Sequence, residues 1–359
     1  MTTTEGPLVH HPAMGAKIRA GAYPDHAAST YTLAETALRE GRGRDAADLA
    51  RYTVQEALEA YELFTAWNRQ IPEFLAARGV AAETIAAEAR RLVSLLASPD
   101  GSAFDGDAGW ARYKALIEEF AIGAETDKGA DAVALLEEAR ATWRDTHDRL
   151  CDGVYGWIDA AARHLGEGIT GELWDVLMSP MYGYYARYDI DNHPWVRSFD
   201  LLMHYALEGL RGHLSGPGRR GDIEVVEEAD RWAIRFNPCG SGGRTMRDDP
   251  DAGTGPRIEP PYGFGVTQEP HDWSWNKKGI CLYCVHCCQL NERMPMRRFG
   301  YPTRVVEPPV WPEARSGTKC TWYVYKDPAL VPEEIYRRVG AVKPARLGGR
   351  AQQAENQDS

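Results

Sequence analysis

The chain lacks long apolar runs and an excess of positive charge. No stretch of its 359 residues approaches the roughly 18 to 20 consecutive apolar residues that a membrane-spanning helix needs. The net charge is -11, and a negative charge of this size repels a phosphate backbone. We therefore expect neither a membrane nor a nucleic acid as partner. The first residues form neither a basic nor an apolar leader segment, which favours a cytoplasmic protein.

Several catalytic motifs are also missing. The sequence has no Gly-x-Ser-x-Gly elbow, no dinucleotide fingerprint and no His-Glu-x-x-His pair. These absences argue against serine hydrolases of the elbow type, nicotinamide enzymes and zincin proteases. Hydrophobic residues make up 43% of the chain and charged residues 26%, which is typical of globular proteins with a packed core.

The first part of the chain has the composition of a helical domain. Between Thr30 and Leu214 it is rich in Ala, Leu, Glu and Arg, and apolar residues recur three and four positions apart. The stripe is clearest at Leu49, Tyr52, Ala57, Tyr61, Phe64 and Trp67. The pattern predicts helices over Asp45–Asn68, Thr84–Leu96, Ala108–Phe120, Ala130–Leu150, Val154–His164 and Pro194–His213.

The second part has a different composition. Most of the 22 prolines follow Gly218, together with short β-branched and aromatic runs. These runs predict two strands within Glu224–Phe236, one at Arg304–Glu307 and one at Thr321–Tyr325. We therefore predict an α+β protein with a helical domain at 30–215 and a β-containing, cysteine-rich metal-binding domain at 219–345. Residues 1–29 are predicted to be a flexible segment and 346–359 a disordered tail.

Six of the seven cysteines lie after residue 238, and four of them fall within residues 281–288. The spacing Cys-x-x-Cys lets one turn point two thiolates at the same ion, as in tetrahedral zinc sites. In a reducing compartment, clustered thiols favour metal or redox chemistry over disulfides. The sequence predicts a zinc site with ligands drawn from Cys239, Cys281, Cys284, His286, Cys287 and Cys320, with Glu307 as a further candidate.

Two other interpretations of the cysteines remain open. Cys281, Cys284 and Cys287 also match the start of an iron–sulfur ligand run, which Cys239 or Cys320 would complete as a [4Fe-4S] site. The proline expected after the last ligand of such a run is absent. The third interpretation is a set of reduced, partly buried thiols without metal, because free cysteine is often buried.

A glycine-rich segment, residues 237–244, follows a predicted strand and contains Cys239. Its glycines allow a close approach of the backbone to an ion or ligand. The segment lacks the Lys-Ser/Thr pair of a phosphate-binding loop, so it is either a ligand-contacting loop or a plain turn.

Residues 279–325 show an ordered set of features: the cysteine segment, then Phe299-Gly-Tyr-Pro-Thr-Arg-Val-Val-Glu307, then Gly317-Thr-Lys-Cys-Thr-Trp-Tyr-Val324. In this order the segment resembles the 4-vinyl reductase domains and the related 2-amino-thiazoline-4-carboxylate hydrolase-like proteins. The resemblance implies a small α+β ligand-binding fold and zinc ligands at Glu307, Cys320 and Cys284. It departs from the family at Trp311, where those proteins often carry a cysteine.

Side chains suited to acid–base chemistry lie just before the cysteines. His271 and Asp272 could move protons near a metal-bound water, and Glu307 could assist them. Trp273 and the aromatic stretch after residue 179 could line a pocket. Tyr185, Arg187, His193 and Trp273 are the predicted substrate-binding residues.

These observations predict a metal-dependent enzyme, with zinc as the expected cofactor, that hydrolyses or cleaves a small organic substrate between the two domains. Two alternatives remain open: an iron–sulfur redox enzyme, and a binding protein that senses a small molecule and uses zinc structurally. The sequence leaves a homodimer open as well.

Overall fold

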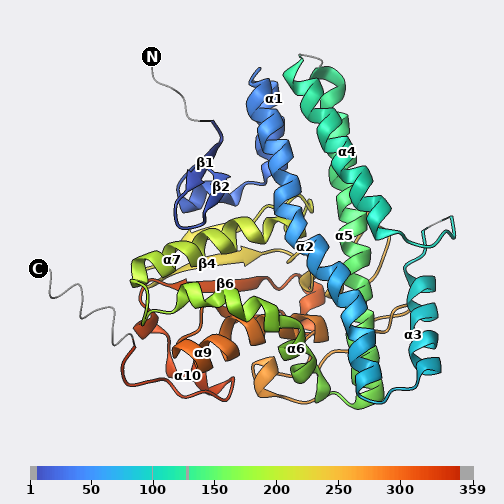
Figure 1. The fold of residues 1–359 in the computed structure, drawn as a ribbon, viewed down its shortest axis with the longest axis vertical. Coiled ribbons are helices and arrows are strands. Elements are labelled where there is room, and N and C mark those ends of the chain that lie inside the picture. Colours follow the sequence, from blue (N-terminus) through green and yellow to red (C-terminus); the bar gives the residue numbers. More distant parts are fainter. Residues whose placement is uncertain (1–5, 99, 127–128, 348–359) are drawn as a thin grey trace, which may run out of the picture. The chain divides into compact units, whose positions relative to one another are not determined.

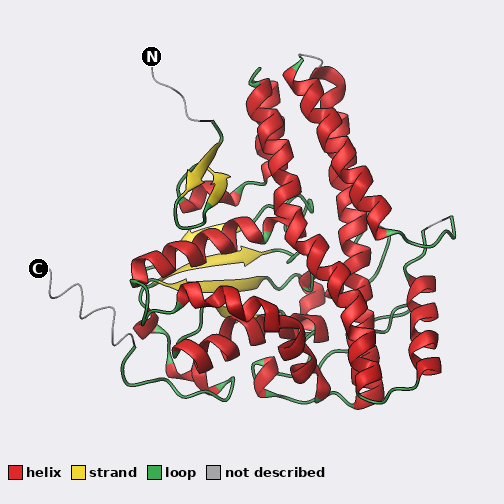
Figure 2. Ribbon diagram, in the orientation of Figure 1, coloured by secondary structure: helices red, strands yellow, loops and turns green. Residues whose placement is uncertain are grey.

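The computed structural model describes residues 6–98, 100–126 and 129–347. Over these residues the chain is a mixture of helices and small sheets, which confirms the predicted α+β class (Figures 1 and 2). None of the described helices combines the length and apolarity needed to cross a membrane. Most of the predicted tail, from residue 348 onward, lies outside the described residues.

Ten α-helices and six strands are found among the described residues. The helices are α1 Thr30–Arg39, α2 Gly43–Ala77, α3 Ala82–Leu95, α4 Gly106–Glu125, α5 Gly129–Leu165, α6 Ile169–Tyr184, α7 Trp195–His204, α8 Val285–Cys288, α9 Met294–Phe299 and α10 Glu333–Arg337. The strands are β1 Leu8–His11, β2 Ala16–Arg19, β3 Glu224–Glu227, β4 Arg231–Phe236, β5 Val305–Glu307 and β6 Cys320–Tyr325.

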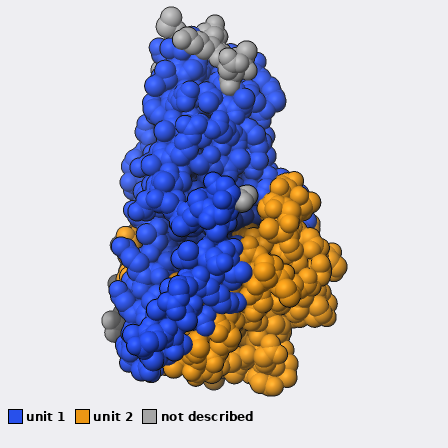
Figure 3. All heavy atoms as spheres, turned by 90° about the vertical axis from the view of Figure 1, so that its right-hand side faces the viewer, with its two compact units in different colours: residues 1–154, 207–223, 236–241 blue, residues 155–206, 224–235, 242–359 orange. Residues whose placement is uncertain are grey.

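The chain forms two compact units that interleave in the sequence (Figure 3). Unit 1 comprises residues 1–154, 207–223 and 236–241, and unit 2 comprises residues 155–206, 224–235 and 242–359. The domains predicted from composition, 30–215 and 219–345, are contiguous. The chain therefore enters unit 2 through α5, returns to unit 1 after residue 206, and passes between the units again around β4.

Unit 1 is built on the long helix α2, which packs against α1 and α4. The predicted apolar stripe is confirmed, because Leu49, Tyr52, Phe64 and Trp67 are all buried. The predicted helices Ala130–Leu150 and Val154–His164 are a single helix, α5. Gly153 does not end this helix. It lets α5 pack closely against Asn68 of α2, because a Cβ at this position would lie 2.5 Å from Oδ1 of Asn68.

Unit 2 contains a four-stranded sheet with the order β3-β4-β6-β5. β3 pairs antiparallel with β4, and β5 pairs antiparallel with β6, at the positions predicted from the β-branched and aromatic runs. α7 packs against β6. α8, a π-helical turn at residues 289–293 and α9 follow one another without a break. This path from residue 285 to 299 carries the cysteine segment.

The predicted helix Pro194–His213 is shorter than expected. α7 ends at His204, and the chain continues through a π-helical turn, Tyr205–Gly209, and a 3-10 turn, Arg211–His213. One reason is a close contact within unit 1, where a Cβ on Gly212 would lie 2.1 Å from the carbonyl oxygen of Glu56. The β1–β2 hairpin was not predicted, because it lies in the segment expected to be flexible.

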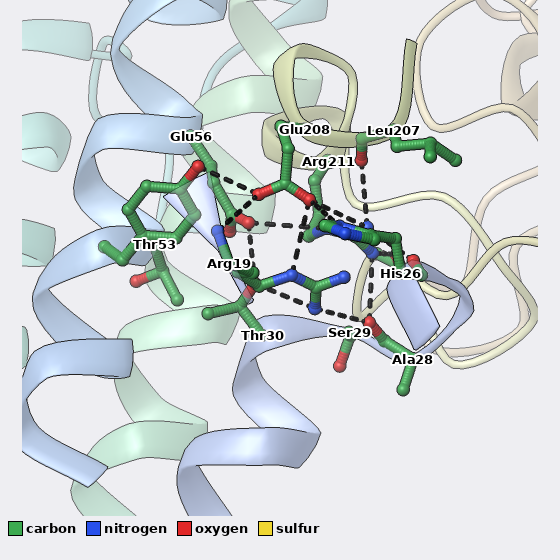
Figure 4. Close-up of polar contacts among 12 residues, drawn as sticks. Arg19, His26, Ala28, Ser29, Thr30, Thr53, Glu56, Leu207, Glu208 and Arg211 are labelled. Atoms are coloured by element: carbon green, nitrogen blue, oxygen red, sulfur yellow. Dashed lines mark hydrogen bonds and ion pairs between the residues drawn. The ribbon is translucent and has the colours of Figure 1, made fainter. Parts of the chain in front are cut away.

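A buried cluster of charged side chains ties the elements of unit 1 together (Figure 4). The carboxylate of Glu208 lies 3.4 Å from Nε of Arg19 and 2.5 Å from Nδ1 of His26, and it accepts a 2.8 Å hydrogen bond from the Tyr52 hydroxyl. These partners come from β2, the 3-10 turn at residues 23–27, and α2. Glu208 therefore joins the N-terminal hairpin to the central helix.

A second carboxylate of the cluster, Glu56, faces Arg211. Thr30 donates a 2.6 Å hydrogen bond to Glu56, and Nε of Arg211 lies 3.3 Å from the same carboxylate. Arg211 also donates to the backbone carbonyls of His26, Ala28, Leu207 and Gly221. Two guanidinium groups thus balance two carboxylates in a region closed to solvent.

The two carboxylates of the cluster ionise differently. Burial raises the pKa of Glu56 to about 7, and this outweighs the opposing charge of Arg211. Burial also acts on Glu208, but the hydrogen bond from His26 and the charges of Arg211 and Arg19 hold its pKa well below the usual range. Glu208 therefore carries the stable negative charge of the cluster.

We predict that Glu56→Gln changes how stability depends on pH. The folded pKa of Glu56, about 7, exceeds its ordinary value of 4.5, so the stabilisation from its proton is complete below 4.5 and is lost as pH rises through 7. Removing the carboxyl should abolish this loss, which is on the order of 3 kcal/mol. Urea unfolding of both proteins between pH 5 and 8 measures it.

Glu62→Gln is the matched control, because Glu62 is an exposed carboxylate on the same helix. Its unfolding free energy should follow that of the unmodified protein across the pH range. Equal pH slopes for Glu56→Gln and the unmodified protein would show that Glu56 ionises normally.

Candidate functional site

The first two thiols of the cysteine segment, Cys281 and Cys284, form a pair in unit 2. Cys281 directly precedes a 3-10 turn, Leu282–Cys284, which continues into α8. This turn brings side chains three positions apart together, and the two thiols are hydrogen-bonded. Cys281 is fully buried and Cys284 is 9% exposed. The pairing expected from the Cys-x-x-Cys spacing is therefore present.

Polar groups surround the sulfur of Cys281. Oγ1 of Thr245 lies 3.6 Å from it, and the Tyr155 hydroxyl is within hydrogen-bonding reach. Burial opposes ionisation of this thiol, but its hydrogen-bonding contacts with Cys284, Tyr155 and Thr245 outweigh burial and lower the pKa of Cys281 to about 7. The hydroxyl protons of Tyr155 and Thr245 are themselves donated to the carbonyls of Gly265 and Gly242. The lowered pKa of Cys281 favours the thiolate, which is the form that binds metals and acts as a nucleophile.

A glycine from the loop at residues 237–244 closes the other side of the pair. A Cβ on Gly242 would lie 2.3 Å from Sγ of Cys284 and 3.0 Å from the ring of Tyr283. The backbone of Gly242 has ordinary right-handed helical angles, so the requirement for glycine is one of space. The loop thus packs directly against the sulfur of Cys284, and the choice between a ligand-contacting loop and a plain turn stays a prediction.

His286 and Cys287 form a second pair on α8. Nδ1 of His286 lies 2.7 Å from the carbonyl oxygen of Tyr283, and Nε2 lies 3.3 Å from Sγ of Cys287. Because Nδ1 must donate to the carbonyl, Nε2 accepts the hydrogen bond that the Cys287 thiol donates. Burial lowers the pKa of His286 to about 4, so its imidazole is neutral at pH 7. Both side chains are partly exposed.

The remaining cysteines have other surroundings. Cys288 is buried, its thiol donates to the carbonyl of Asp272, and burial keeps its pKa well above the usual value. Cys320 begins β6 and is 7% exposed. Cys239 belongs to unit 1, where its sulfur lies 3.4 Å from the hydroxyl of Ser241.

The donor atoms suit a thiophilic metal by their chemistry, but they are arranged as pairs. Among the residues that the structure describes, no cysteine belongs to a group of three candidate ligand atoms that all lie within 4.8 Å of one another. Cys281 with Cys284 can supply two ligands without rearrangement. A third or fourth ligand, such as His286 or Cys287, requires its side chain to turn.

Each of the three predicted catalytic side chains is hydrogen-bonded to a polar side chain within unit 2. Nε2 of His271 lies 2.7 Å from Glu167, and Asp272 accepts a 2.6 Å hydrogen bond from Arg293. Glu307 accepts hydrogen bonds from Arg338 at 2.6 Å and Lys277 at 3.3 Å. Burial raises the pKa of Glu307, but the charges of Arg338 and Lys277 outweigh burial and hold this pKa below its ordinary value.

The predicted substrate-binding residues do not share one environment. Tyr185 is buried, and its hydroxyl lies 3.5 Å from Arg304. Arg187 stacks over Tyr184, with 5.2 Å from the guanidinium carbon to the ring centroid. Trp273 stacks on His271 at 4.1 Å between ring centroids. His193 lines a cavity in unit 2. Only Trp273 is thus shown beside a predicted catalytic residue, His271.

Sequence reasoning missed a polar chain in unit 1. Nε2 of His147 lies 2.9 Å from Nδ1 of His213, and its Nδ1 lies 2.8 Å from Asp148. Arg219 binds Asp148 through both terminal nitrogens and also donates to the carbonyl of Gly240. The chain thereby holds the glycine-rich loop. No local signal reveals it, because its members lie up to about 90 residues apart.

Searches of protein-family models, curated proteins and solved structures found no match to this chain. The resemblance to the 4-vinyl reductase and hydrolase-like domains therefore stays a prediction from the motifs in residues 279–325.

We predict that Gly242→Ala disrupts the thiol pair. The added methyl group meets Sγ of Cys284 at 2.3 Å, so either the loop or the sulfur must move. Overpacking of this kind costs about 1 to 3 kcal/mol. The displacement should also raise the pKa of Cys281, because its hydrogen bond from Cys284 is disturbed. Urea unfolding and a pH titration of the thiolate's ultraviolet absorbance measure the two effects.

Gly183→Ala provides the control, because a Cβ at this position on α6 meets no atom within 4 Å. Alanine within a helix should stabilise the protein by about 0.5 to 1 kcal/mol and leave the thiolate titration unchanged. If Gly242→Ala is as stable as Gly183→Ala, the close approach to Cys284 is not a constraint.

Proposed function

We propose that this chain is a thiolate metalloenzyme, with zinc as its metal and a small organic molecule as its substrate. The observation that supports the proposal is the hydrogen-bonded pair of Cys281 and Cys284, one of which has a pKa of about 7. A thiol with this pKa loses its proton to a metal at neutral pH at little cost.

Cys281 and Cys284 are the proposed core ligands. The hydroxyl groups of Tyr155 and Thr245 lie beside Cys281 but donate to the carbonyls of Gly265 and Gly242, so either hydroxyl would have to turn to support a thiolate as outer partners do around metal-ligating residues. His286 is a further candidate ligand. Its Nδ1–H is fixed on the Tyr283 carbonyl, and its Nε2 lone pair, which accepts from Cys287, could bind a metal once that thiol turns away. Cys287 is the proposed fourth candidate.

Zinc bound in this way would supply a Lewis acid for hydrolysis or cleavage. The protein's own contribution begins with proton transfer, for which His271, Asp272 and Glu307 remain the predicted groups. Each of them is held by an oppositely charged or hydrogen-bonding partner. We propose that these contacts orient the groups, and that a substrate must compete with Glu167, Arg293 or Arg338 to reach them.

The metal content of the purified full-length protein tests the proposal. We predict about one equivalent of zinc for the unmodified protein after zinc supply and removal of excess metal. Cys284→Ala should retain less than about a tenth of an equivalent. Cys151→Ala is the control, because Cys151 is a buried cysteine in α5 of unit 1, and it should keep the full metal content.

Three other results would contradict the proposal of a catalytic zinc ion. A brown protein with broad absorbance near 400 nm after anaerobic purification, carrying iron and sulfide, would establish the cluster alternative. A protein that stays free of metal after zinc supply would support the interpretation of the cysteines as reduced thiols without a metal. Loss of zinc accompanied by loss of folding in Cys284→Ala would indicate a structural ion, as expected for the small-molecule sensor.

Zinc affinity should fall as pH falls below about 7. The ligand must lose its proton, and Cys281 is protonated below its pKa of about 7. We predict at least about a tenfold loss of affinity for each pH unit below this value. Competition with a chromogenic chelator between pH 5.5 and 8 measures the loss. An affinity that does not vary with pH would exclude Cys281 as a ligand.

A further inference from the structure

Unit 2 contains a cavity of about 640 Å³ away from the residues of the thiol pair. Its walls come from the start of α7, the turn after β6 and the segment 343–347. A cavity of this volume matches the usual range for small-molecule sites, about 300 to 1,000 Å³. All of its lining residues belong to unit 2.

The charges around this cavity are mainly positive in a protein whose net charge is -11. Lys326, Lys343 and Arg346 line it, against one carboxylate, Asp327. Asp327 accepts a hydrogen bond from the backbone of Ala329. An excess of cations over carboxylates favours an anion in the cavity.

Two of the three cations remain available to a ligand. Lys326 pairs with Glu227 at 2.7 Å. Lys343 donates only to the uncharged carbonyl of Ala329, at 2.7 Å. Among the described residues, neither Lys343 nor Arg346 forms an ion pair with a carboxylate. Their positive charges are therefore uncompensated at the cavity wall.

The lining also includes apolar side chains and a rigid aromatic ring. Nε1 of Trp195 donates a 2.6 Å hydrogen bond to the carbonyl of Lys326, and its ring packs edge-on against Tyr301 at 5.4 Å. A fixed indole offers a flat surface at little entropic cost. Ile190, Pro194, Pro328 and Leu347 add further apolar surface.

We propose that this cavity binds a small organic anion with a flat apolar body, of the aryl carboxylate class. Lys343 and Arg346 would pair with the carboxylate, and Trp195 would stack on the apolar body. His193, one of the predicted substrate-binding residues, lies in the same lining. The proposal is independent of the metal centre, because none of the lining residues is a candidate ligand.

Isothermal titration of the full-length protein with 1-naphthylacetate and 1-naphthylacetamide tests the proposal. The two probes have nearly the same shape, and only the first carries a charge. We expect the carboxylate to bind at least about tenfold more tightly, the usual effect of one charge-assisted hydrogen bond. Its affinity should fall as salt rises from 50 to 500 mM, because the cations are near the surface. Inorganic phosphate should bind at least about tenfold more weakly than the naphthyl carboxylate.

Variants at exposed positions locate the binding. Arg346→Gln should weaken naphthylacetate binding about tenfold and leave naphthylacetamide within twofold. Val196→Glu adds a negative charge at a lining residue that is 73% exposed, so it should weaken the carboxylate similarly without disturbing the fold. Lys278→Gln is the control, because this lysine pairs with Glu269 and does not line the cavity.

The ligand class and the location of the site are each overturned by a different result. Equal binding of acid and amide, or equal binding of phosphate and naphthylacetate, would overturn the proposed ligand class. Unchanged naphthylacetate binding in both Arg346→Gln and Val196→Glu would overturn the location, whatever the affinity of the unmodified protein.

Discussion

The need to neutralise buried charge governs unit 1. A carboxylate without access to water must be paired, and Glu208 is paired with Arg19, His26 and Tyr52 from three separate elements. The hairpin, the first helices and the turn after α7 are joined because they share this charge. Removing one of these side chains would leave a buried charge without its partner, so the cluster behaves as a single structural unit. Glu56 fits beside Glu208 because its raised pKa limits the negative charge that the cluster must hold.

Unit 2 meets the same requirement around Glu292, which is fully buried. Its carboxylate accepts hydrogen bonds from Trp275, from the backbone of Val306 in β5, and from Arg338. Arg338 in turn reaches Glu307. The loop before the cysteines, the π-helical turn and the sheet thus meet at one acid. The cysteine segment follows that loop and runs into that turn, so this acid fixes both of its ends.

The sequence analysis succeeded where the signal is local. The 3.6-residue stripe from Leu49 to Trp67 identified α2, and short β-branched and aromatic runs identified β4 and β6, because each pattern depends on neighbours within a few positions. The spacing of Cys281 and Cys284 likewise predicted their contact. The partners of Cys281 could not be predicted, since Tyr155 lies 126 residues before it and neither its type nor its spacing marks a site. The pairing of Arg19 with Glu208 spans 189 residues and was missed for the same reason.

The π-helical turn at residues 289–293 has a consequence for how this chain can vary in length. Such a turn holds one more residue than the α-helical turn it replaces. Deleting one residue there would restore a regular helix between α8 and α9 and leave α9 close to its present rotation about the helix axis, because the wide turn already accommodates the extra residue. A further deletion would act on a regular helix and would rotate everything after it by about 100° relative to the cysteines. Relatives of this chain can therefore differ from it by one residue between Val285 and Phe299, at this turn, but not by two.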